Sequence, residues 1–516
     1  MALPHPYGSD SARANILRTP DASLRGLAEQ ALSRTAGAPL VPGNRVALLR
    51  DATDNFPAWL AAMERAQRSI LLETYIFADD RVGNRFAAAL AGAAGRGVQV
   101  RVLQDWFGAR GEGRKHFGRL EDAGIEVRWF NPFHFEAPLS WLRRDHRKSL
   151  VVDGQIGFVT GLCMAERWEG DPARGIAPWR DAGVEIEGPA VADLAHAFAR
   201  TWAEAGGAMQ AEELPRREDI PMCGDVALRI IATEPSTTGV LRLDQFIAAA
   251  ARRTLWLTDA YFIGMPSYVQ ALRSAAVDGV DVRLLVPGAS DLGMVKRLGI
   301  AGYRPLLESG IRVFEWNGPM LHAKTAVADG RWARVGSTNL NLASWMGNWE
   351  LDVAVEDAKF AREMEQSFEA DLGNATEIVL GRRRREVRVP GERRRASPAR
   401  GKEGSAVATA GAIRIGNSVS AALGGRRVLG PAESNLIVAP GLALIAVAVL
   451  GVLWPRVVFF PLVLAFGWLG VTLLIHAVKV HRERGHGELR LAAPSASGGA
   501  PRSLPAGTGT GNEASP

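Results

Sequence analysis

A short pattern, His-x-Lys-x4-Asp, occurs twice in this chain and brings together residue types that handle phosphate. The six positions are His146, Lys148 and Asp153 in the first copy and His322, Lys324 and Asp329 in the second. Because the chain contains only nine histidines and seven lysines, two matches to this spacing are not expected by chance. An imidazole can attack phosphorus or transfer a proton, and an ammonium group can bind a phosphate oxygen. The duplicated pattern therefore predicts one site for phosphodiester chemistry.

Each copy lies in an apolar run that is broken by Asp-Gly, a strong signal for a β-hairpin. Alternate residues of a strand share a face, so the histidine and the lysine of each copy point the same way. If each Asp-Gly forms a two-residue turn, His146 lies opposite Gly161 and His322 lies opposite Ser337. This register would bring Ser337 and Asn339 to the second histidine, where both could hydrogen-bond to phosphate oxygen. The two motif aspartates would then serve first as turn residues, before any part in the chemistry.

The sequence around the motifs is duplicated as well. Residues 93–103 and 275–285 are identical at seven of eleven positions, and residues 70–77 parallel residues 255–262. Each half reads as strand, helix, strand, helix, strand and then the hairpin that carries the motif. Short apolar strands that alternate with amphipathic helices are typical of α/β folds. We therefore expect two duplicated α/β lobes with pseudo-two-fold symmetry, and we expect the two motifs to meet at the junction between them.

The length of 516 residues exceeds what one hydrophobic core usually serves, so we expect several parts. We predict an N-terminal extension at residues 1–43, a first lobe at 44–215, a second lobe at 216–375, a flexible basic linker at 376–434, an apolar hairpin at 435–480 and a disordered tail at 481–516. The extension lacks the apolar segment of a signal peptide. The only cysteines, Cys163 and Cys223, give no disulfide framework, which suits a reducing cytoplasm. No cluster of His, Cys and carboxylate residues has metal-ligand spacing, so we expect no metal.

Two apolar runs near the C-terminus predict attachment to a membrane. Residues 436–453 and 457–478 are each close to the ~20 residues that cross a bilayer, and the short break between them predicts a transmembrane helical hairpin. Arginines before the hairpin and cations after it place both of its ends in the cytoplasm. A buried soluble hairpin is the alternative. The basic residues 382–402 would also bind anionic lipid, at ~1 kcal/mol per cation near the surface, although a nucleic-acid-binding tail would have a similar composition.

The paired motifs, followed in the second half by Gly-Ser-x-Asn at residues 336–339, resemble those of the phospholipase D superfamily over about residues 44–375. Within that superfamily, Tyr-Ile-Phe-x-Asp-Asp at 75–80, Trp-Arg-Asp at 179–181 and Ile-Glu-Gly-Pro-Ala at 186–190 resemble bacterial cardiolipin synthases. The resemblance implies an enzyme that moves a phosphatidyl group between alcohols and that needs no metal or other cofactor.

The first motif departs from the superfamily pattern, because Thr160 and Cys163 stand where glycine and asparagine are usual. The first half therefore lacks the amide that Asn339 supplies in the second half.

The same resemblance implies roles for the histidines and for two carboxylates. His146 would attack phosphorus and form a covalent phosphohistidine, and His322 would act as acid and base, although the residues by themselves leave this order open. The two motif lysines would bind the nonbridging oxygens. Each histidine also needs an acceptor on its other ring nitrogen. Asp181 follows the first histidine by 35 residues and Glu350 follows the second by 28, where relatives place such a partner.

The first half contains an extra segment before its motif. There are 22 residues from Gly124 to His146 but only 12 from Gly310 to His322. The extra residues, 132–144, are aromatic and aliphatic and end in Arg143 and Arg144. We predict that this segment enters a lipid interface with the arginines on headgroup phosphate. A segment that only packs into the core is the alternative.

The favoured function is a phosphatidyltransferase of the bacterial inner membrane that forms cardiolipin from two molecules of phosphatidylglycerol. Its catalytic region would lie on the cytoplasmic face. A hydrolase that releases phosphatidic acid is a close alternative, and a nuclease or a membrane scaffold is a weaker one. The apolar hairpin opposes a nuclease, so we expect no nucleic-acid partner. The sequence does not indicate an oligomeric state.

Overall fold

The computed structural model describes residues 24–111, 114–133, 143–235, 237–380 and 386–388, together with positions 463, 467, 468, 470 and 471. The chain divides into two compact units at residues 1–442 and 443–516, and the fold below belongs to the first unit. Apart from those five positions, the expected hairpin at 435–480 and the tail at 481–516 lie outside the described residues. Within the described part of the chain, no helix has the length and apolar character needed to cross a membrane.

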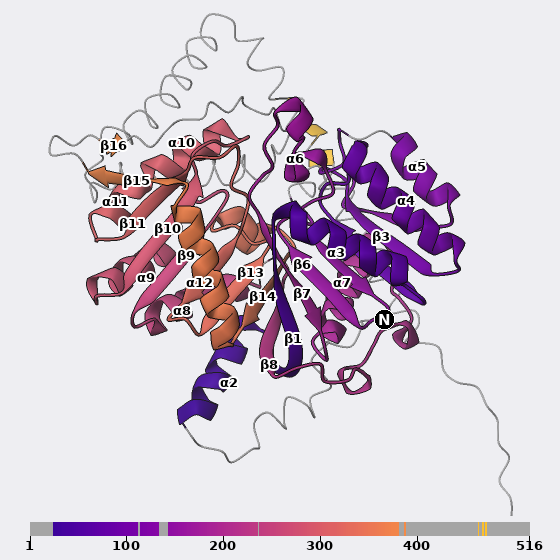
Figure 1. Cartoon of the computed structure of the whole chain (residues 1–516), viewed down its shortest axis with the longest axis horizontal. Coiled ribbons are helices and arrows are strands. Elements are labelled where there is room, and N and C mark those ends of the chain that lie inside the picture. The colour runs from indigo at the N-terminus through magenta and orange to yellow at the C-terminus, as the bar shows by residue number, and fades with distance from the viewer. Residues whose placement is uncertain are drawn as a thin grey trace, which may run out of the picture. The chain divides into compact units, whose positions relative to one another are not determined.

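A single sheet of sixteen strands runs through both halves of the first unit (Figure 1). Its order is β16-β15-β11-β10-β9-β12-β13-β14-β8-β1-β7-β6-β5-β2-β3-β4. The strands of the first half are β1 (Val41–Arg50), β2 (Ser69–Thr74), β3 (Gln99–Asp105), β4 (Glu126–Phe130), β5 (Ser149–Val152), β6 (Ile156–Thr160) and β7 (Ala182–Glu187). The strands of the second half are β8 (Val226–Thr233), β9 (Thr254–Thr258), β10 (Asp281–Pro287), β11 (Arg312–Trp316), β12 (Thr325–Ala328), β13 (Trp332–Gly336), β14 (Glu350–Val355), β15 (Ala375–Leu380) and β16 (Glu386–Arg388).

The order of strands is symmetric about the pair β1–β8, which confirms two duplicated α/β lobes. In each half three parallel strands lead into an antiparallel hairpin and then into a strand near the midline. The halves join where β1 and β8 pair through Val41 with Leu228 and Asn44 with Val226. The register shifts between these pairs, and the buried Asn44 amide donates to the carbonyls of Val41 (2.8 Å) and Val226 (3.3 Å). The amide thus replaces ladder bonds that the shift removes.

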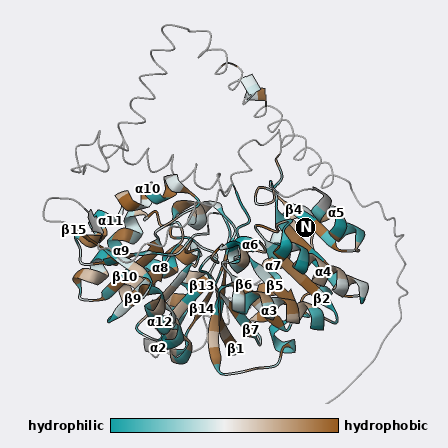
Figure 2. Ribbon diagram, turned by 45° about the horizontal axis from the view of Figure 1, so that its top comes forward, coloured by the Kyte–Doolittle hydropathy of each residue, from teal (hydrophilic) through white to brown (hydrophobic). Residues whose placement is uncertain are grey.

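Helices cover both faces of the sheet. They are α2 (Leu24–Ala36), α3 (Asp51–Arg65), α4 (Arg81–Gly95), α5 (Arg114–Asp122), α6 (Glu166–Glu169), α7 (Val191–Gly206), α8 (Gly239–Ala250), α9 (Pro266–Val277), α10 (Gly293–Ala301), α11 (Tyr303–Leu307) and α12 (Ala358–Leu372). One core lies under α3–α5, one under α8, α9 and α11, and a third under α7 and α12, with strands of both halves. Figure 2 shows hydrophobic colour concentrated on the strands and hydrophilic colour on many helices. The third core therefore joins the two lobes.

Helix α4 illustrates how the sequence specifies these elements. Its buried residues Val82, Phe86, Leu90 and Ala93 recur at helical spacing, so one face of the helix is apolar. The Asp80 side chain caps the first turn by accepting hydrogen bonds from the backbone of residues 82 and 83. Together the cap and the apolar face place α4 on the sheet between β2 and β3.

The two motif hairpins form as expected, but their register differs by one residue from the prediction. Val152 pairs with Ile156 and Ala328 pairs with Trp332, so each loop has three residues instead of two. The loop aspartates adopt positive φ angles near +54°, and the glycines that follow are also left-handed. The prediction of two-residue turns is therefore wrong, because Asp-Gly here opens a longer loop. The residue opposite Lys148 is Thr160, whose amide donates to the lysine carbonyl (3.2 Å).

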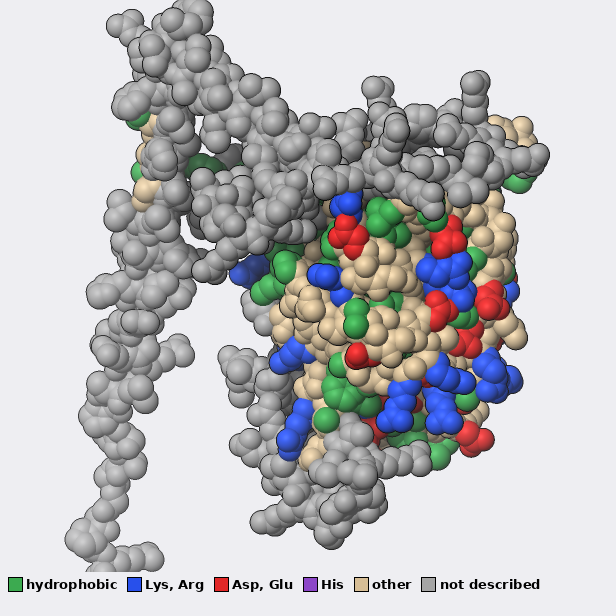
Figure 3. All heavy atoms as spheres, turned by 90° about the vertical axis from the view of Figure 1, so that its left-hand side faces the viewer, with side chains coloured by type: hydrophobic (Ala, Val, Ile, Leu, Met, Phe, Trp, Pro, Cys, Tyr) green, Lys and Arg blue, Asp and Glu red, His purple; other side chains and the backbone are tan. Residues whose placement is uncertain are grey.

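Regular structure extends beyond the two lobes as the sequence divided them. Helix α2 lies within residues 1–43 and packs against α8, and its Glu29 forms an ion pair with the buried Arg229 of β8. Residues 375–380 and 386–388 form β15 and β16 at the sheet edge, although the sequence placed most of them in a flexible linker. On the face that Figure 3 shows, acidic and basic side chains are interspersed. Pairs such as Arg312 with Glu377 (2.8 Å) in the second half fit this mixture.

Candidate active site

The backbone of each motif histidine is held by a segment from the other half, just before β14 or β7. The amide of His146 donates to the carbonyl of Trp349 (2.9 Å), and the amide of His322 donates to the carbonyl of Arg180 (2.7 Å). Each contact forms a short parallel bridge across the junction. In both cases the residue after the acceptor is a carboxylate. The two motifs therefore meet at the junction of the lobes, as the duplication predicted.

Each histidine side chain makes a hydrogen bond to the carboxylate that follows its backbone acceptor in the other half. His146 Nδ1 lies 3.0 Å from Glu350 Oε2, and His322 Nδ1 lies 2.7 Å from Asp181 Oδ2. The sequence placed each carboxylate with the histidine that precedes it, and this pairing is wrong. Strands β7 and β14 lie next to the midline pair, and the residue just before β7 and the first residue of β14 face the motif of the opposite half. All four side chains are buried.

Both carboxylates remain ionised in this buried setting. Burial alone would raise the pKa of Asp181, but the charge and the hydrogen bond of His322 outweigh it and hold the pKa below its usual range. The pKa of Glu350 is lowered in the same way, because His146 outweighs the effect of burial. An ionised carboxylate fixes the ring orientation of its histidine and stabilises the imidazolium form. The arrangement thus provides two oriented imidazoles.

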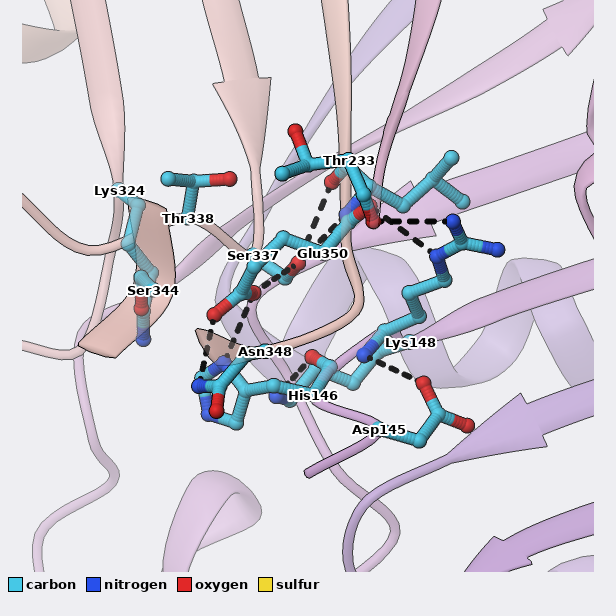
Figure 4. A network of polar contacts seen from close by, with 12 residues as sticks. Asp145, His146, Lys148, Thr233, Lys324, Ser337, Thr338, Ser344, Asn348 and Glu350 are labelled. Atoms are coloured by element: carbon cyan, nitrogen blue, oxygen red, sulfur yellow. Dashed lines mark hydrogen bonds and ion pairs between the residues drawn. The ribbon is translucent and has the colours of Figure 1, made fainter. Parts of the chain in front are cut away.

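Neighbouring side chains hold the two carboxylates in place, and Figure 4 shows those around Glu350. Glu350 accepts hydrogen bonds from the hydroxyl of Ser337 (2.6 Å) and from the amide of Asn348 (3.2 Å). Asp181 accepts one from the indole nitrogen of Trp168 (2.9 Å). Ser337 was expected beside the second histidine as a phosphate ligand. Its hydroxyl instead supports the carboxylate that serves the first histidine.

The aromatic surroundings of the two histidines differ. The ring centroids of Trp168, Trp179 and Tyr261 lie 5.3, 5.7 and 5.9 Å from that of His322. In contrast, the ring of His146 contacts that of Tyr75, with centroids 5.1 Å apart. An imidazolium is stabilised by nearby indole rings. The His322 ring is therefore enclosed by more aromatic side chains than the described ring contacts give to His146.

The motif lysines are buried beside their histidines. Lys148 Nζ donates to the carbonyl of His146 (2.6 Å) and lies 5.2 Å from the ring of Tyr75. Lys324 Nζ lies 2.9 Å from His322 Nε2 and 5.9 Å from the ring of Tyr261. Lys324 thus contacts the ring of its histidine, whereas Lys148 contacts the backbone of its own. Each is placed to bind a nonbridging phosphate oxygen.

The motif aspartates lie at the hairpin tips, where they fasten the loops to neighbouring strands. The carboxylate of Asp153 accepts from the backbone amides of Gln67, Arg68 and Ser69 (2.7–2.9 Å). The carboxylate of Asp329 accepts from those of Arg252, Arg253 and Thr254 (2.7–3.3 Å). Among the described residues, neither carboxylate makes a hydrogen bond or ion pair with a motif histidine or lysine. These contacts agree with a turn role and separate both aspartates from the reacting groups.

Asn339 and its counterpart Cys163 are both buried. Within the residues that the structure describes, the Asn339 Oδ1 atom accepts no hydrogen bond. At this pair of equivalent positions the second half carries an amide and the first half a thiol.

Sequence reasoning missed a buried arginine under the first motif. Arg147 is fully buried, and it donates to the carbonyl of Glu350 (3.1 Å). Its other contacts are the Ala197 carbonyl (2.9 Å), the Thr201 hydroxyl (2.7 Å), the Thr233 carbonyl (3.1 Å) and the Glu73 carboxylate (4.0 Å). The second motif has Ala323 at this position, next to a small cavity of about 10 Å³. Comparison of the two motifs residue by residue would have singled out this arginine.

Two buried carboxylates accompany Arg147. Burial raises the pKa of Glu73, and the charge of Arg147 opposes this shift. Burial and then the charge of Glu73 raise the pKa of Asp145 well above its ordinary value. Both shifts favour the protonated form of a carboxyl group beside the guanidinium. The second half has Leu321 in place of Asp145, so this network belongs to the first half alone.

The extra segment of the first half is only partly described, because residues 134–142 lie outside the described residues. Arg143 is exposed. Arg144 is buried, pairs with Asp105 (3.2 Å) and donates to the carbonyl of Asn131 (3.3 Å). The prediction that Arg144 binds headgroup phosphate is therefore wrong, since its guanidinium anchors the segment instead.

The site combines two oriented imidazoles, two buried ammonium groups and one amide at the junction of the lobes. Such a set can pass a phosphoryl group from one alcohol to another, because one imidazole can attack phosphorus while the other carries the proton. In the described part of the chain, no group of three or more metal-binding side chains is found.

Comparisons with known proteins agree with this chemistry. A family profile described as "Cardiolipin synthase, PLD-like domain" matches residues 59–171 and 243–372, and each segment contains one motif. "Cardiolipin synthase A" of Pseudomonas aeruginosa is 33% identical over 364 residues, which are 69% of this chain and 72% of that protein. "Cardiolipin synthase 1" of Bacillus cereus is 28% identical over 359 residues, 68% of this chain and 70% of that protein.

A solved structure shows the same fold at low identity. Phosphatidylserine synthase of Haemophilus influenzae superposes with a TM-score of 0.53 at 13% identity, covering 67% of this chain and 91% of that one. The likeness extends to the duplicated lobes and not to a particular substrate. From the family profile and the relatives together, this chain belongs to the cardiolipin synthase family, the phosphatidyltransferases of the phospholipase D superfamily.

Proposed function

We propose that this enzyme forms cardiolipin and glycerol from two molecules of phosphatidylglycerol through a covalent phosphohistidine. The single observation that supports this best is the pairing of the histidines with carboxylates across the junction. Each imidazole is held by an ionised carboxylate from the other lobe. Two such imidazoles on one phosphorus allow transfer in two similar steps.

In the first step His146 Nε2 attacks the phosphorus of the donor lipid. The bond from phosphorus to the glycerol oxygen breaks, and His322 gives its proton to the departing glycerol. Lys148 and Lys324 bind the nonbridging oxygens, on which negative charge accumulates in the transition state. The aromatic rings around His322 favour its protonated form at this stage.

In the second step His322 is neutral and acts as a base. It removes the proton from a hydroxyl of the acceptor lipid, and that oxygen attacks the phosphorus. The bond to His146 breaks and the free imidazole is regenerated. The product is cardiolipin when the acceptor is phosphatidylglycerol, and phosphatidic acid when water takes its place.

The site would act at a membrane surface, because both lipids carry acyl chains. We assign the apolar residues 435–480 as the anchor and the cytoplasmic face as the side on which the lobes lie, on the basis of the apolar runs and the flanking cations.

The test uses the full chain in detergent with phosphatidylglycerol labelled in its phosphate. Cardiolipin and glycerol are the expected products. Phosphatidic acid as the main product would show that the enzyme is a hydrolase and not a transferase. Denaturing the His322→Ala variant at alkaline pH, where a phosphorus–nitrogen bond survives, should trap label on His146, identified by mass spectrometry. The His146→Ala variant should trap none, and label on His322 instead would reverse the roles. Arg312→Ala, which removes a surface ion pair, is the matched control and should retain full turnover.

A further inference from the structure

Arg167 lies beside the aromatic rings that surround His322. Its guanidinium carbon is 5.4 Å from the ring centroid of Trp168 and 5.3 Å from that of Trp179. The same two rings contact the imidazole of His322. Arg167 is thus one ring away from the histidine that would receive and release the alcohol. Stacking on indole rings also keeps a guanidinium in a fixed orientation.

The carboxylates around Arg167 already serve other arginines. Glu166 pairs with Arg81 (3.4 Å) and Arg174 (3.8 Å), and Glu169 pairs with Arg81 and Arg85 (both 2.7 Å). Asp171 pairs with Arg174 (3.8 Å). Within the described residues, no carboxylate is paired with Arg167. A half-buried guanidinium in this setting can take an anion from outside the protein.

The segment that carries Arg167 is longer than its counterpart in the second half. The equivalent pairs Thr160 to Asp181 and Gly336 to Glu350 span 21 and 14 positions. The extra residues belong to the segment around α6, which Figures 1 and 2 show near the junction of the halves. Because the second half has no such extension, this cation is present only on the His322 side of the site.

This one-sided placement matches the chemistry of transfer. The leaving and the attacking alcohols both occupy the side of phosphorus opposite the nucleophile, next to His322. The acceptor lipid differs from water and from glycerol because it carries its own phosphodiester, one glycerol unit away from the attacking hydroxyl. We propose that Arg167 binds the phosphate of the acceptor lipid and so selects a phosphatidylglycerol headgroup over water or a neutral alcohol. This inference rests on the proposed function and names a specificity-determining residue for its second step.

The first experiment measures two transfers from the same donor by the full chain in detergent. One is cardiolipin formation, which needs an acceptor with phosphate, and the other is incorporation of labelled glycerol into phosphatidylglycerol, which does not. Arg167→Gln should lower cardiolipin formation at least about tenfold and leave glycerol incorporation within about twofold. Arg167→Lys should recover part of the cardiolipin activity. The control Arg174→Gln removes a more exposed arginine of the same segment and should change neither rate.

Equal losses in both transfers, or no loss in either, would overturn the proposal. A thermal unfolding curve for each variant identifies any loss that comes from misfolding. If Arg167→Gln is misfolded, the two transfers are compared in the Arg167→Lys variant instead.

A second experiment needs no turnover. Glycerol phosphate is titrated into the His146→Ala variant while the tryptophan fluorescence is recorded, because the anion would lie close to Trp168 and Trp179. Adding Arg167→Gln should weaken this binding at least about tenfold, whereas glycerol alone should cause no change in either protein. Unchanged affinity for glycerol phosphate would refute the role of Arg167 even if cardiolipin is the product. If the affinity for glycerol phosphate is lost but turnover yields phosphatidic acid, Arg167 does bind an anion and the enzyme is not a transferase.

Discussion

Replacement of Arg147 by methionine tests how the junction is held together. The guanidinium is fully buried, donates to three carbonyls and one hydroxyl, and lies beside the carboxylates Glu73 and Asp145. Methionine fills much of the same volume but leaves those acceptors without a donor. Loss of one partner from a buried charged network costs about 3–5 kcal/mol. We therefore expect the free energy of unfolding to fall by that amount.

The effect should depend on pH. Arg147 opposes the rise that burial imposes on the pKa of Glu73, so in the variant this pKa rises further. The folded state then binds the proton more tightly than the unfolded chain. The stability that this proton provides is present at low pH and is lost as pH rises through the folded-state pKa. The deficit of the Arg147→Met variant should therefore be larger at pH 8 than at pH 5.

The assay is urea unfolding of the full chain in detergent, followed by tryptophan fluorescence at both pH values. The additional change Glu73→Gln should restore part of the loss at pH 8, because it removes the carboxylate that lost its partner. Arg312→Met breaks an exposed ion pair and should cost less than about 1 kcal/mol. A loss below about 1 kcal/mol for Arg147→Met, or no recovery in the double variant, would refute the view that this arginine neutralises a buried charge.

Three further predictions concern the site and its supports. Asp181→Asn and Glu350→Gln should each lower kcat by about 10²- to 10⁴-fold with little change in KM, measured as cardiolipin formation, and an effect below tenfold would argue against orientation by these carboxylates. Asp153→Ala should cost about 2 kcal/mol of stability, because it removes three accepted backbone hydrogen bonds, yet leave kcat within a few-fold; a large fall in kcat at unchanged stability would place this aspartate in the chemistry. Burial raises the pKa of Asp259 from 3.8 to about 7, so stability should fall as pH rises from about 4 to 7, and Asp259→Asn should flatten this part of the curve in urea unfolding at several pH values; an unchanged slope would contradict the assignment.

Much of the architecture could be predicted from the sequence because the two halves repeat each other. The repeat identified the order of strands and helices, the hairpins and the six motif positions, since the periods of strands and helices are local properties. The sheet edge was harder. Residues 375–380 alternate weakly and lie next to a run of arginines, and they form β15 because the edge of β11 is available for pairing.

Contacts across the junction could not be predicted in the same way. The distance in sequence from a histidine to the next suitable carboxylate does not report which lobe that carboxylate faces. The pairings of Asp181 and Glu350 depend on where β7 and β14 begin relative to the midline, which is a property of the assembled sheet. The hairpin register also required the backbone, because Asp-Gly occurs in loops of two residues and of three. Arg147 was overlooked because it lies among other charged residues of the first motif, and the one signal for it is the contrast with Ala323 of the second.

The exchange of carboxylates between the lobes has a consequence for how such chains can diverge. Each motif segment must match a partner segment encoded in the opposite half of the gene, so the sequences of the two halves cannot change independently. A chimera that joined the first half of this protein to the second half of a distant relative would test both matches at once. Duplication supplied two similar halves, and because of the reciprocal contacts a change in one half now requires a matching change in the other.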